Sequence, residues 1–235
     1  MMKNVIFIFA RSGSKGLKNK NIKNFNGKPL LYWTIQQAKK IKKIDSIILS
    51  TDSKKIARIG KKFGANIFFL RPKKLATDRS PEWLSWQHAT KFIENKFKTN
   101  LEKIVVLPIT SPCRKVKDIN ACIKLYETKK FDSTMVISRT GLHPAFNLVN
   151  KNKINQIQLI DTKSKFYRRQ QFKNSFKLTT VALVTNSSTI LNNKRIFDGN
   201  VGGVEIPNSR AIDIDTIEDF LYCEYLFKKK RYDRF

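Results

Sequence analysis

Residues 5–10 of the sequence, VIFIFA, are followed at once by residues 11–16, RSGSKG. A short apolar run of this kind predicts a strand that is buried on both faces of a sheet. The glycine-containing segment predicts a tight loop, because glycine lets the backbone bend sharply and approach a ligand closely. Ligands of parallel α/β sheets bind just beyond the carboxyl ends of the strands, so this loop is the first candidate binding element.

The chain beyond this loop alternates between apolar runs and helical patterns. We expect strands at residues 5–9, 47–50, 67–70 and 104–107, and helices at residues 29–41, 53–63, 81–97 and 118–128. Ser53 is a plausible N-cap for the second helix, and Gly64 is expected to end it. This β-α-β-α order predicts an α/β fold with a mostly parallel, doubly wound sheet.

The alternation of predicted strands and helices stops between residues 132 and 176. Short strands are expected at residues 134–138 and 146–149, and a polar stretch rich in Lys, Asn and Gln follows them. We interpret residues 132–176 as a protruding β-hairpin excursion from a single domain that spans residues 1–235. Beyond it, residues 180–185 and 204–206 return to strands, and Thr216 is expected to cap a C-terminal helix.

Composition narrows the class of protein. The chain has 235 residues, of which 41% are hydrophobic, so it can bury a sizeable core. No apolar run approaches the roughly 20 residues that a membrane span needs, and no signal peptide is recognised. We therefore expect a cytoplasmic protein with no membrane partner. The three cysteines and two histidines form no CxxC pair and no Cys/His cluster, which argues against a disulfide framework or a zinc site.

The formal net charge is +29, from 47 Lys and Arg against 18 Asp and Glu. Such a balance can indicate nucleic-acid binding. Because the lysines are scattered along the whole chain, we favour a basic surface without a nucleic-acid partner. The rival interpretation, a nucleic-acid-binding protein, predicts binding whose affinity falls steeply with salt.

The loop after the first strand has the chemistry of a phosphate cradle. Gly13 and Gly16 allow close approach of the backbone, while Arg11, Ser14 and Lys20 add donors and positive charge. The spacing matches neither a Walker A loop nor a Rossmann fingerprint. The alternative is an ordinary glycine-rich turn in a lysine-rich protein.

A pair of carboxylates lies near the C-terminus, in residues 211–216, AIDIDT. Alternate residues of an extended segment point the same way, so Asp213 and Asp215 can face one site while Ile212 and Ile214 face the core. Two carboxylates suit Mg²⁺, which takes oxygen ligands from protein and phosphate together. The alternative is that Asp215 or Thr216 merely caps the last helix.

Two further loops follow predicted strands. Thr110 and Ser111 come after the fourth strand, and Arg71 and Asp78 come after the third. Both loops lie where a base and a ribose could be bound. A simple turn is the alternative for each.

Taken in order, these segments resemble the acylneuraminate cytidylyltransferases (CMP-sialic acid synthetases) over nearly the whole chain. The segments that carry the resemblance are residues 10–17 (ARSGSKGL), 20–21 (KN), 27–30 (GKPL), 50–53 (STDS), 71–72 (RP), 75–78 (LATD), 110–114 (TSPCR), 169–171 (RQQ) and 212–216 (IDIDT). The resemblance implies a GT-A-like nucleotidyltransferase fold and a homodimer in which the excursion reaches the partner's active site. It also implies a Mg²⁺-dependent reaction in which CTP and an α-keto sugar acid give a CMP-sugar and pyrophosphate.

The resemblance also implies roles for single residues. Arg11 and Lys20 would bind the triphosphate and stabilise the leaving pyrophosphate, and Asp213 and Asp215 would hold Mg²⁺, with Asp215 counted among the catalytic residues. The other implied contacts are Gly13, Ser14 and Asn21 in the phosphate cradle, Arg71, Asp78, Thr110 and Ser111 at the nucleotide, and Arg169 and Gln170 at the sugar acid.

The segments expected to lie near the sugar acid differ from the family pattern. Pro108-Ile109 stands where many members have Gln-Pro, and residues 179–182 (TTVA) stand where many have Asn-Gly-Ala. Sialic, legionaminic and pseudaminic acids and an eight-carbon keto-deoxy sugar acid therefore all stay open as acceptors. A nucleotidyltransferase for another substrate, such as a sugar phosphate or a molybdopterin, is a further alternative.

Overall fold

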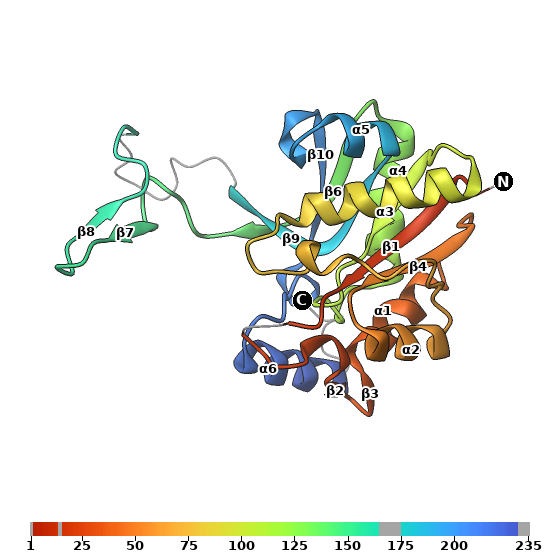
Figure 1. Cartoon of the computed structure of the whole chain (residues 1–235). Coiled ribbons are helices and arrows are strands. Elements are labelled where there is room, and N and C mark those ends of the chain that lie inside the picture. Colours follow the sequence, from red (N-terminus) through yellow and green to blue (C-terminus); the bar gives the residue numbers. More distant parts are fainter. Residues whose placement is uncertain (1, 14–15, 165–174, 230–235) are drawn as a thin grey trace.

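A six-stranded sheet runs through the part of the chain that the computed structural model describes, residues 2–13, 16–164 and 175–229 (Figure 1). The strands lie side by side in the order β10 (Val201–Ile206), β6 (Ser133–Thr140), β9 (Ser175–Thr185), β5 (Lys103–Val106), β1 (Asn4–Ala10) and β4 (Ser46–Thr51). β9 runs antiparallel to both of its neighbours, and the other neighbouring pairs are parallel. The predicted mostly parallel sheet is confirmed.

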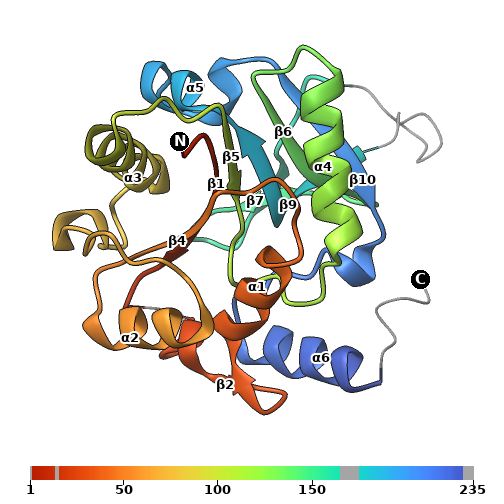
Figure 2. The same ribbon diagram turned by 90° about the vertical axis from the view of Figure 1, so that its right-hand side faces the viewer.

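Helices cover both faces of this sheet, as a doubly wound fold requires. They are α1 (Leu30–Ala38), α2 (Lys54–Phe63), α3 (Glu82–Phe97), α4 (Val116–Thr128), α5 (Ser187–Asn192) and α6 (Ile217–Lys228). α3 and α5 pack on one face, and α1, α2, α4 and α6 pack on the other (Figure 2).

Strand β1 shows why the sheet needs both layers. Ile6 and Ile8 belong to the core under α1 and α4, whereas Val5 and Phe7 belong to the core under α3. All four side chains are 0% exposed. Because successive strand residues point to opposite faces, the unbroken apolar run predicted for this strand buries one set of side chains in each layer.

The expected helix signals at residues 53–64 and 216 are confirmed. The hydroxyl of Ser53 accepts a hydrogen bond from the amide of Ile56 at the start of α2, and Gly64 ends that helix with a φ of 99°. Thr216 caps α6 by accepting from the amide of Asp219 at 3.2 Å. The start of the last helix is therefore fixed immediately after Asp215.

The strand expected at residues 67–70 does not form. Asn66 makes a single bridge to Ile48 of β4, and the amide of Arg71 donates to the carbonyl of Thr51, but the residues between them leave the ladder. Phe68 and Phe69 instead pack against aromatic side chains of α3. The apolar side chains of this run are thus buried against a helix. A short apolar run does not show from sequence alone whether it is buried in a sheet or against a helix.

The excursion begins later than expected. Residues 133–140, placed inside it by the sequence, form β6 of the central sheet. The projecting part carries a small antiparallel hairpin, β7 (Val149–Lys151) with β8 (Ile157–Leu159) (Figure 1). Residues 146–149 were expected to form a short strand. Only Val149 belongs to β7, and residues 146–148 lie at a turn, where their backbone amides all donate to the carbonyl of His143.

Smaller elements complete the described chain. They are the paired strands β2 (Asn24–Phe25) and β3 (Lys28–Pro29) and the 3₁₀ turns η1 (Lys20–Ile22), η2 (Lys73–Leu75), η4 (Ile196–Asp198) and η5 (Asn208–Arg210). Within the described ranges, every helix is too short or too polar to cross a lipid bilayer.

A buried ion pair ties η5 to α4. The guanidinium of Arg210 donates to both carboxylate oxygens of Asp118 at 3.0–3.2 Å, and the two side chains are 10% and 3% exposed. Asp118 also accepts from the amide of Lys115 at 2.9 Å, which caps α4. This pair therefore anchors the segment that leads to Asp213.

We expect Asp118→Ala to lower the free energy of unfolding by about 3–5 kcal/mol, because it leaves the Arg210 charge buried without its partner. Chemical denaturation measures this loss. The matched control is Glu102→Ala, which breaks the exposed pair with Lys3 and should cost less than about 1 kcal/mol. Equal losses in the two variants would contradict a structural role for the buried pair.

Candidate functional site

The loops that follow β1 and β5, together with the segment that leads into α3, meet the segment before α6 around a pocket of about 600 Å³. This is the edge of the sheet at which an α/β fold is expected to bind its ligands. The pocket is lined by Phe9, Arg11, Gly16, Lys20, Asn21, Arg71, Leu75, Thr77, Asp78, Ser80, Glu82, Ser85, Thr110, Asp215 and Thr216. Most of the candidate residues chosen from the sequence are thus brought to one place.

The loop after β1 is held from two sides. Asp52, at the end of β4, accepts hydrogen bonds from the amide of Ser12 at 2.9 Å and from its hydroxyl at 2.5 Å. Burial alone would raise the pKa of Asp52, but these bonds from Ser12 bring it below its ordinary value. On the other side, the side-chain Nδ2 of Asn21 donates to the backbone carbonyl of Arg11 at 3.0 Å. Asp52 is therefore an anchor for the loop.

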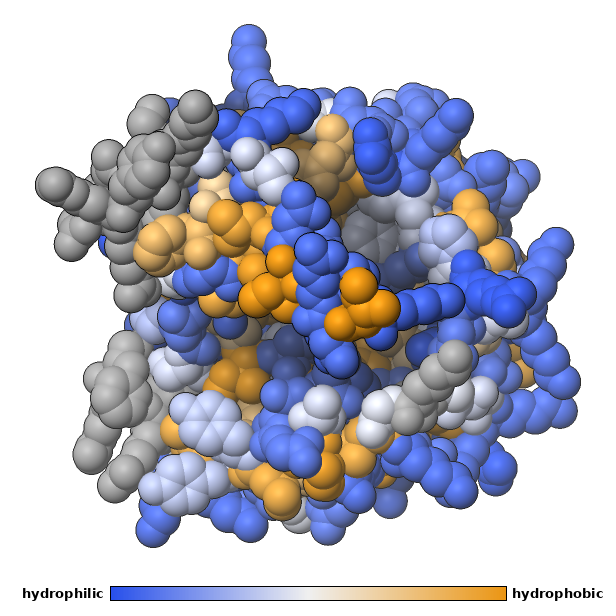
Figure 3. Space-filling model, turned by 90° about the vertical axis from the view of Figure 1, so that its left-hand side faces the viewer, coloured by the Kyte–Doolittle hydropathy of each residue, from blue (hydrophilic) through white to orange (hydrophobic). Residues whose placement is uncertain are grey.

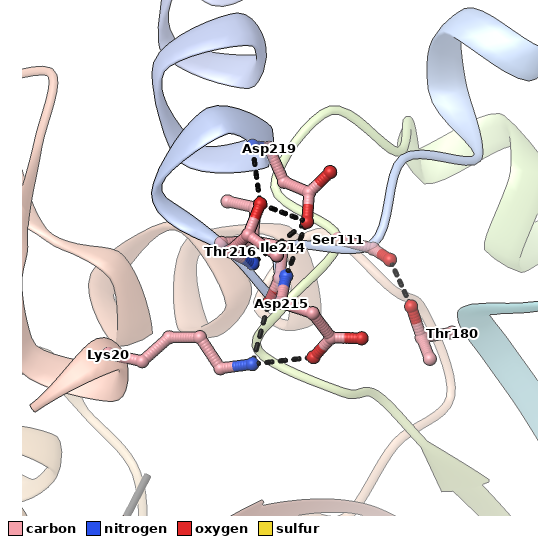
Figure 4. Close-up of polar contacts among 7 residues, drawn as sticks. All are labelled: Lys20, Ser111, Thr180, Ile214, Asp215, Thr216 and Asp219. Carbon is pink, nitrogen blue, oxygen red and sulfur yellow. Dashed lines mark hydrogen bonds and ion pairs between the residues drawn. The ribbon is translucent and has the colours of Figure 1, made fainter. Parts of the chain in front are cut away.

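The two cations proposed for the triphosphate both point into this pocket. Arg11 pairs with Asp78, and each side chain is 36% exposed. Lys20 donates to a carboxylate oxygen of Asp215 at 2.9 Å and to the carbonyl of Ile214 at 2.6 Å (Figure 4). Because partly exposed pairs are weak, an anionic ligand can compete with Asp78 and Asp215 for these two cations.

Gly16 packs directly against the segment that carries the carboxylates. A Cβ at position 16 would collide with the carbonyl oxygen of Asp215. The amide of Ile214 donates to the carbonyl of Thr110 at 2.9 Å. The loops after β1 and β5 therefore both contact the backbone of residues 214–215. A close backbone approach of this kind requires glycine.

Arg71 is buried at the base of the pocket. Its Nη1 donates to the hydroxyl of Ser85 at 3.2 Å, while its Nε and Nη2 find no hydrogen-bond partner among the described residues. Burial lowers the pKa of Arg71, and the charges of Asp52 and Glu82 oppose that shift. Buried donors without partners are costly, so these two nitrogens are suited to an acceptor on a ligand.

Asp213 lies where two large pockets meet. A smaller cavity of about 240 Å³ is lined by Asp213, Asp215, Thr110 and Thr180, and it shares residues with the pocket described above and with a second pocket. That second pocket, of about 670 Å³, is lined by Lys177, Leu178, Thr179, Thr180, Asn208, Ser209, Ala211, Ile212, Asp213, Asp219 and Tyr222. The carboxylate pair therefore stands between two spaces large enough for two substrates.

The environment of Asp213 suits a divalent cation. Its Oδ1 is buried and accepts no hydrogen bond from the described residues. Burial raises the pKa of Asp213 and the negative charge of Asp215 adds to the effect, while hydrogen bonds from the Thr110 and Thr180 side chains oppose it. Within the described residues, no group of three or more His, Cys, Asp or Glu side chains could form a closed metal cage. Two carboxylates with open space beside them fit Mg²⁺, which binds through one or two carboxylates together with substrate phosphates.

Glu82 is a pocket residue that sequence reasoning missed. Its carboxylate lines both the main pocket and the smaller cavity. Although the residue as a whole is exposed, the protein around its carboxyl group raises the pKa by desolvation. In the sequence it is simply the acidic first residue of a helix, a common position for glutamate, so no signal distinguished it.

The remaining candidates are placed less directly. Gly13 faces open space, since a Cβ there would meet no atom within 4 Å. Ser111 is fully buried and shares a hydrogen bond of 2.7 Å with the hydroxyl of Thr180, so it supports the site from below (Figure 4). Ser14, Arg169 and Gln170 lie outside the described residues.

Apolar side chains gather on the projecting side of the molecule, next to the hollowed surface (Figure 3). Those of the excursion and of the outer part of β9 that are 40–79% exposed are Leu142, Phe146, Val149, Ile154, Ile157, Ile160, Phe176 and Leu178. Exposed apolar surface of this extent commonly marks a site of association.

Comparison with known proteins gives consistent matches. A family model described as cytidylyltransferase matches residues 5–195. The chain is 31% identical over 224 residues to the CMP-N,N'-diacetyllegionaminic acid synthase of Campylobacter jejuni, with 95% of this chain and 94% of that protein covered. It is 29% identical over 237 residues to the N-acylneuraminate cytidylyltransferase of Streptococcus agalactiae, with 97% of this chain and 56% of that protein covered.

Solved structures share the fold. A CMP:2-keto-3-deoxy-manno-octonic acid synthetase complexed with CTP superimposes with a TM-score of 0.73 at 13% identity, and the match covers 97% of this chain and 99% of that one. At this identity the likeness concerns the fold alone.

We expect Asp213→Asn to raise the free energy of unfolding at neutral pH. The Asp213 carboxyl has a higher pKa in the folded than in the unfolded protein, where it is near 3.8, so the ionised wild-type group destabilises the fold above that range. The gain should shrink as the pH falls towards 3.8, because the carboxyl is then protonated in both states. Denaturant unfolding across this pH range measures it.

The matched control is Asp215→Asn, which removes an exposed partner of Lys20 and should give no such gain. An Asp213→Asn variant that is less stable than the wild type at neutral pH would contradict the raised pKa of this carboxyl group.

Proposed function

The chain belongs to the cytidylyltransferase family, and on that premise we propose that it transfers CMP from CTP to an α-keto sugar acid of the sialic, legionaminic or pseudaminic type and releases pyrophosphate. Sequence relatives named for legionaminic acid and acylneuraminate support this acceptor class over an eight-carbon sugar acid. The observation that carries the proposal is the position of Asp213 and Asp215 between two pockets, of which the one beside the loop after β1 is lined by the cationic side chains of Arg11, Lys20 and Arg71.

We propose that the nucleotide occupies the pocket beside the loop after β1. Arg11 and Lys20 would leave their carboxylate partners and neutralise the triphosphate oxygens. The unpartnered nitrogens of Arg71 would donate to acceptors near the base. Gly16 and Asn21 would shape the cradle around the phosphates.

The acceptor would occupy the pocket on the other side of Asp213. Lys177 and Asn208 line this space and offer a cation and an amide to an acidic, hydroxyl-rich sugar. Thr179 and Thr180, which depart from the family pattern in sequence, line the same pocket, so they are placed to influence which sugar is accepted. Arg169 and Gln170, lying outside the described residues, are retained as proposed sugar contacts on the resemblance alone.

The reaction would be a displacement at the α-phosphorus of CTP. The anomeric hydroxyl of the sugar acid attacks and loses its proton to solvent, a bond from its oxygen to the α-phosphorus forms, and the bond from that phosphorus to the pyrophosphate oxygen breaks. Such transfers rely on positioning and charge neutralisation more than on covalent chemistry from the protein. Arg11 and Lys20 stabilise the charge that accumulates on the leaving pyrophosphate. Mg²⁺ held by Asp213 and Asp215 would polarise the phosphate under attack.

We further propose a homodimer that buries the apolar side of the excursion. The eight exposed apolar residues there offer a surface that a second copy can cover. A cytoplasmic location is part of the same proposal.

The assay combines CTP and Mg²⁺ with a panel of sialic, legionaminic, pseudaminic and eight-carbon keto-deoxy acids and detects the CMP product by mass. We expect product with at least one nine-carbon acid, and Arg11→Ala should lower kcat/KM by about 100- to 1,000-fold because a charge-stabilising donor is lost. Arg58→Ala, an exposed arginine on α2, is the control and should keep wild-type activity. Wild-type turnover in folded Arg11→Ala, or product with the eight-carbon acid alone, would contradict the proposal.

Oligomeric state is tested by light scattering after size exclusion. The wild type should run as a dimer, and Ile157→Asp should dissociate it, because a charge would be placed in the buried interface. Phe197→Asp is the control, because Phe197 in η4 is 57% exposed and Ile157 is 63% exposed, but Phe197 lies outside the excursion. A monomeric wild type, or dissociation by both variants alike, would refute an interface at the excursion.

A further inference from the structure

Two of the three cysteines meet beside the site. Cys113 lies in the loop that follows Thr110, and Cys223 lies on the inward face of α6, the helix that begins after Asp215. Both side chains are 0% exposed, and their Sγ atoms are 2.8 Å apart. That separation is shorter than van der Waals contact between two sulfur atoms. The fold therefore brings two thiols, 110 residues apart in sequence, into bonding reach.

The third cysteine provides a contrast within the same molecule. Cys122 on α4 is also 0% exposed, but its Sγ contacts the hydroxyl of Thr134 at 3.5 Å. Burial in an apolar core alone therefore does not create a sulfur pair. The meeting of Cys113 with Cys223 follows from packing α6 against the loop after β5.

We propose that Cys113 and Cys223 are a redox-modification site that forms an intramolecular disulfide when the protein meets an oxidant of the disulfide class, such as oxidised glutathione. The thiolate of one cysteine attacks the glutathione disulfide and releases one glutathione thiol. The second cysteine, losing its proton, attacks the mixed disulfide and releases the other. The two protein thiols lose two electrons and two protons, and the oxidant is reduced to two thiols.

Access to the pair comes through α6. This helix lies at one side of the fold, near the end of the described chain (Figure 2). Its residues Leu221, Tyr222 and Tyr225 are 46–57% exposed. Helices at the periphery open more readily than core strands, and opening α6 would expose both sulfurs together.

Chemistry within the closed fold is slow. Contact with Cys113 and burial raise the pKa of Cys223, so its thiol stays protonated while α6 is in place. The reaction should therefore proceed over hours and faster at mildly alkaline pH. Once formed, the disulfide would join the loop that carries Thr110 to α6, the helix that follows Asp215. Both of these segments lie beside the candidate metal site.

The sequence makes the linkage unambiguous to detect. Trypsin cleaves after Lys and Arg, so Cys113, Cys122 and Cys223 fall on three separate peptides, residues 104–114, 118–124 and 211–228. Native protein is incubated with oxidised glutathione, its remaining thiols are alkylated in denaturant, and the digest is analysed by mass spectrometry without reductant. We expect peptide 104–114 joined to peptide 211–228 and lighter by two hydrogen atoms than their sum, with Cys122 alkylated.

Two controls separate the pair from general thiol oxidation. Cys122→Ser should still form the link, whereas Cys223→Ser should not, and the linked chain should run as a monomer on a non-reducing denaturing gel. Protein oxidised while unfolded should give mixed pairings that include Cys122. Alkylation of all three cysteines after oxidation of the native protein, a link that includes Cys122, or a link between two chains would overturn the proposal. These readouts need no substrate and do not depend on the proposed activity.

Discussion

The backbone of Ile214 and Asp215 is the point on which the site depends. The amide of Ile214 bonds to the loop after β5, its carbonyl accepts from Lys20, and the carbonyl of Asp215 leaves room for no side chain at Gly16. Two segments that are distant in sequence, the one after β1 that carries Gly16 and Lys20 and the loop after β5, are thereby held around one short segment. The side chains of Asp213 and Asp215 project beside this backbone. Asp215 also pairs with Lys20, and the hydroxyl groups of Thr110 and Thr180 interact with the carboxylate of Asp213.

Two buried arginines show how the fold separates support from binding. Arg114 is 1% exposed and donates to Gln37, Pro108, Val181 and Thr34 at 2.6–2.9 Å, so every nitrogen of its guanidinium has an acceptor. Burial without a carboxylate partner lowers its pKa to about 9, and it stays charged at neutral pH. Arg71 is 6% exposed and leaves two nitrogens unpartnered at the base of a pocket. Satisfied buried groups hold structure, whereas unsatisfied groups that face a cavity are kept for a ligand.

Much of the fold could be predicted from the sequence, because in many segments the structure favoured by local residue pattern is also the one that tertiary packing requires. The apolar run at residues 5–9, the N-caps at Ser53 and Thr216 and the alternation of Asp213 with Ile214 all keep in the structure the role that their pattern predicts. The prediction of a strand at residues 67–70 was wrong, because an apolar stretch can be buried against a helix as well as in a sheet. A single sequence does not say which neighbour will cover it.

Site residues were predictable by region and less so by orientation. Ser111 and Arg114 belong to the same motif as Thr110, but they point into the core because the loop turns after Thr110. Glu82 was not singled out, and Asp52 was included only as part of residues 50–53 with no role assigned, because a first-turn glutamate and an aspartate after a strand are common for purely local reasons. Their roles come from the loops that they face, and that information lies in long-range packing.

The most direct test of this account is a crystal structure of the protein with Mn²⁺ in place of Mg²⁺ and a CTP analogue that cannot release pyrophosphate. The account predicts an anomalous metal peak about 2.1 Å from carboxylate oxygens of Asp213 and Asp215 and from the α-phosphate. It also predicts the triphosphate against Arg11 and Lys20 and the base towards Arg71. A metal peak away from both carboxylates, or a nucleotide bound outside the loop after β1, would contradict it.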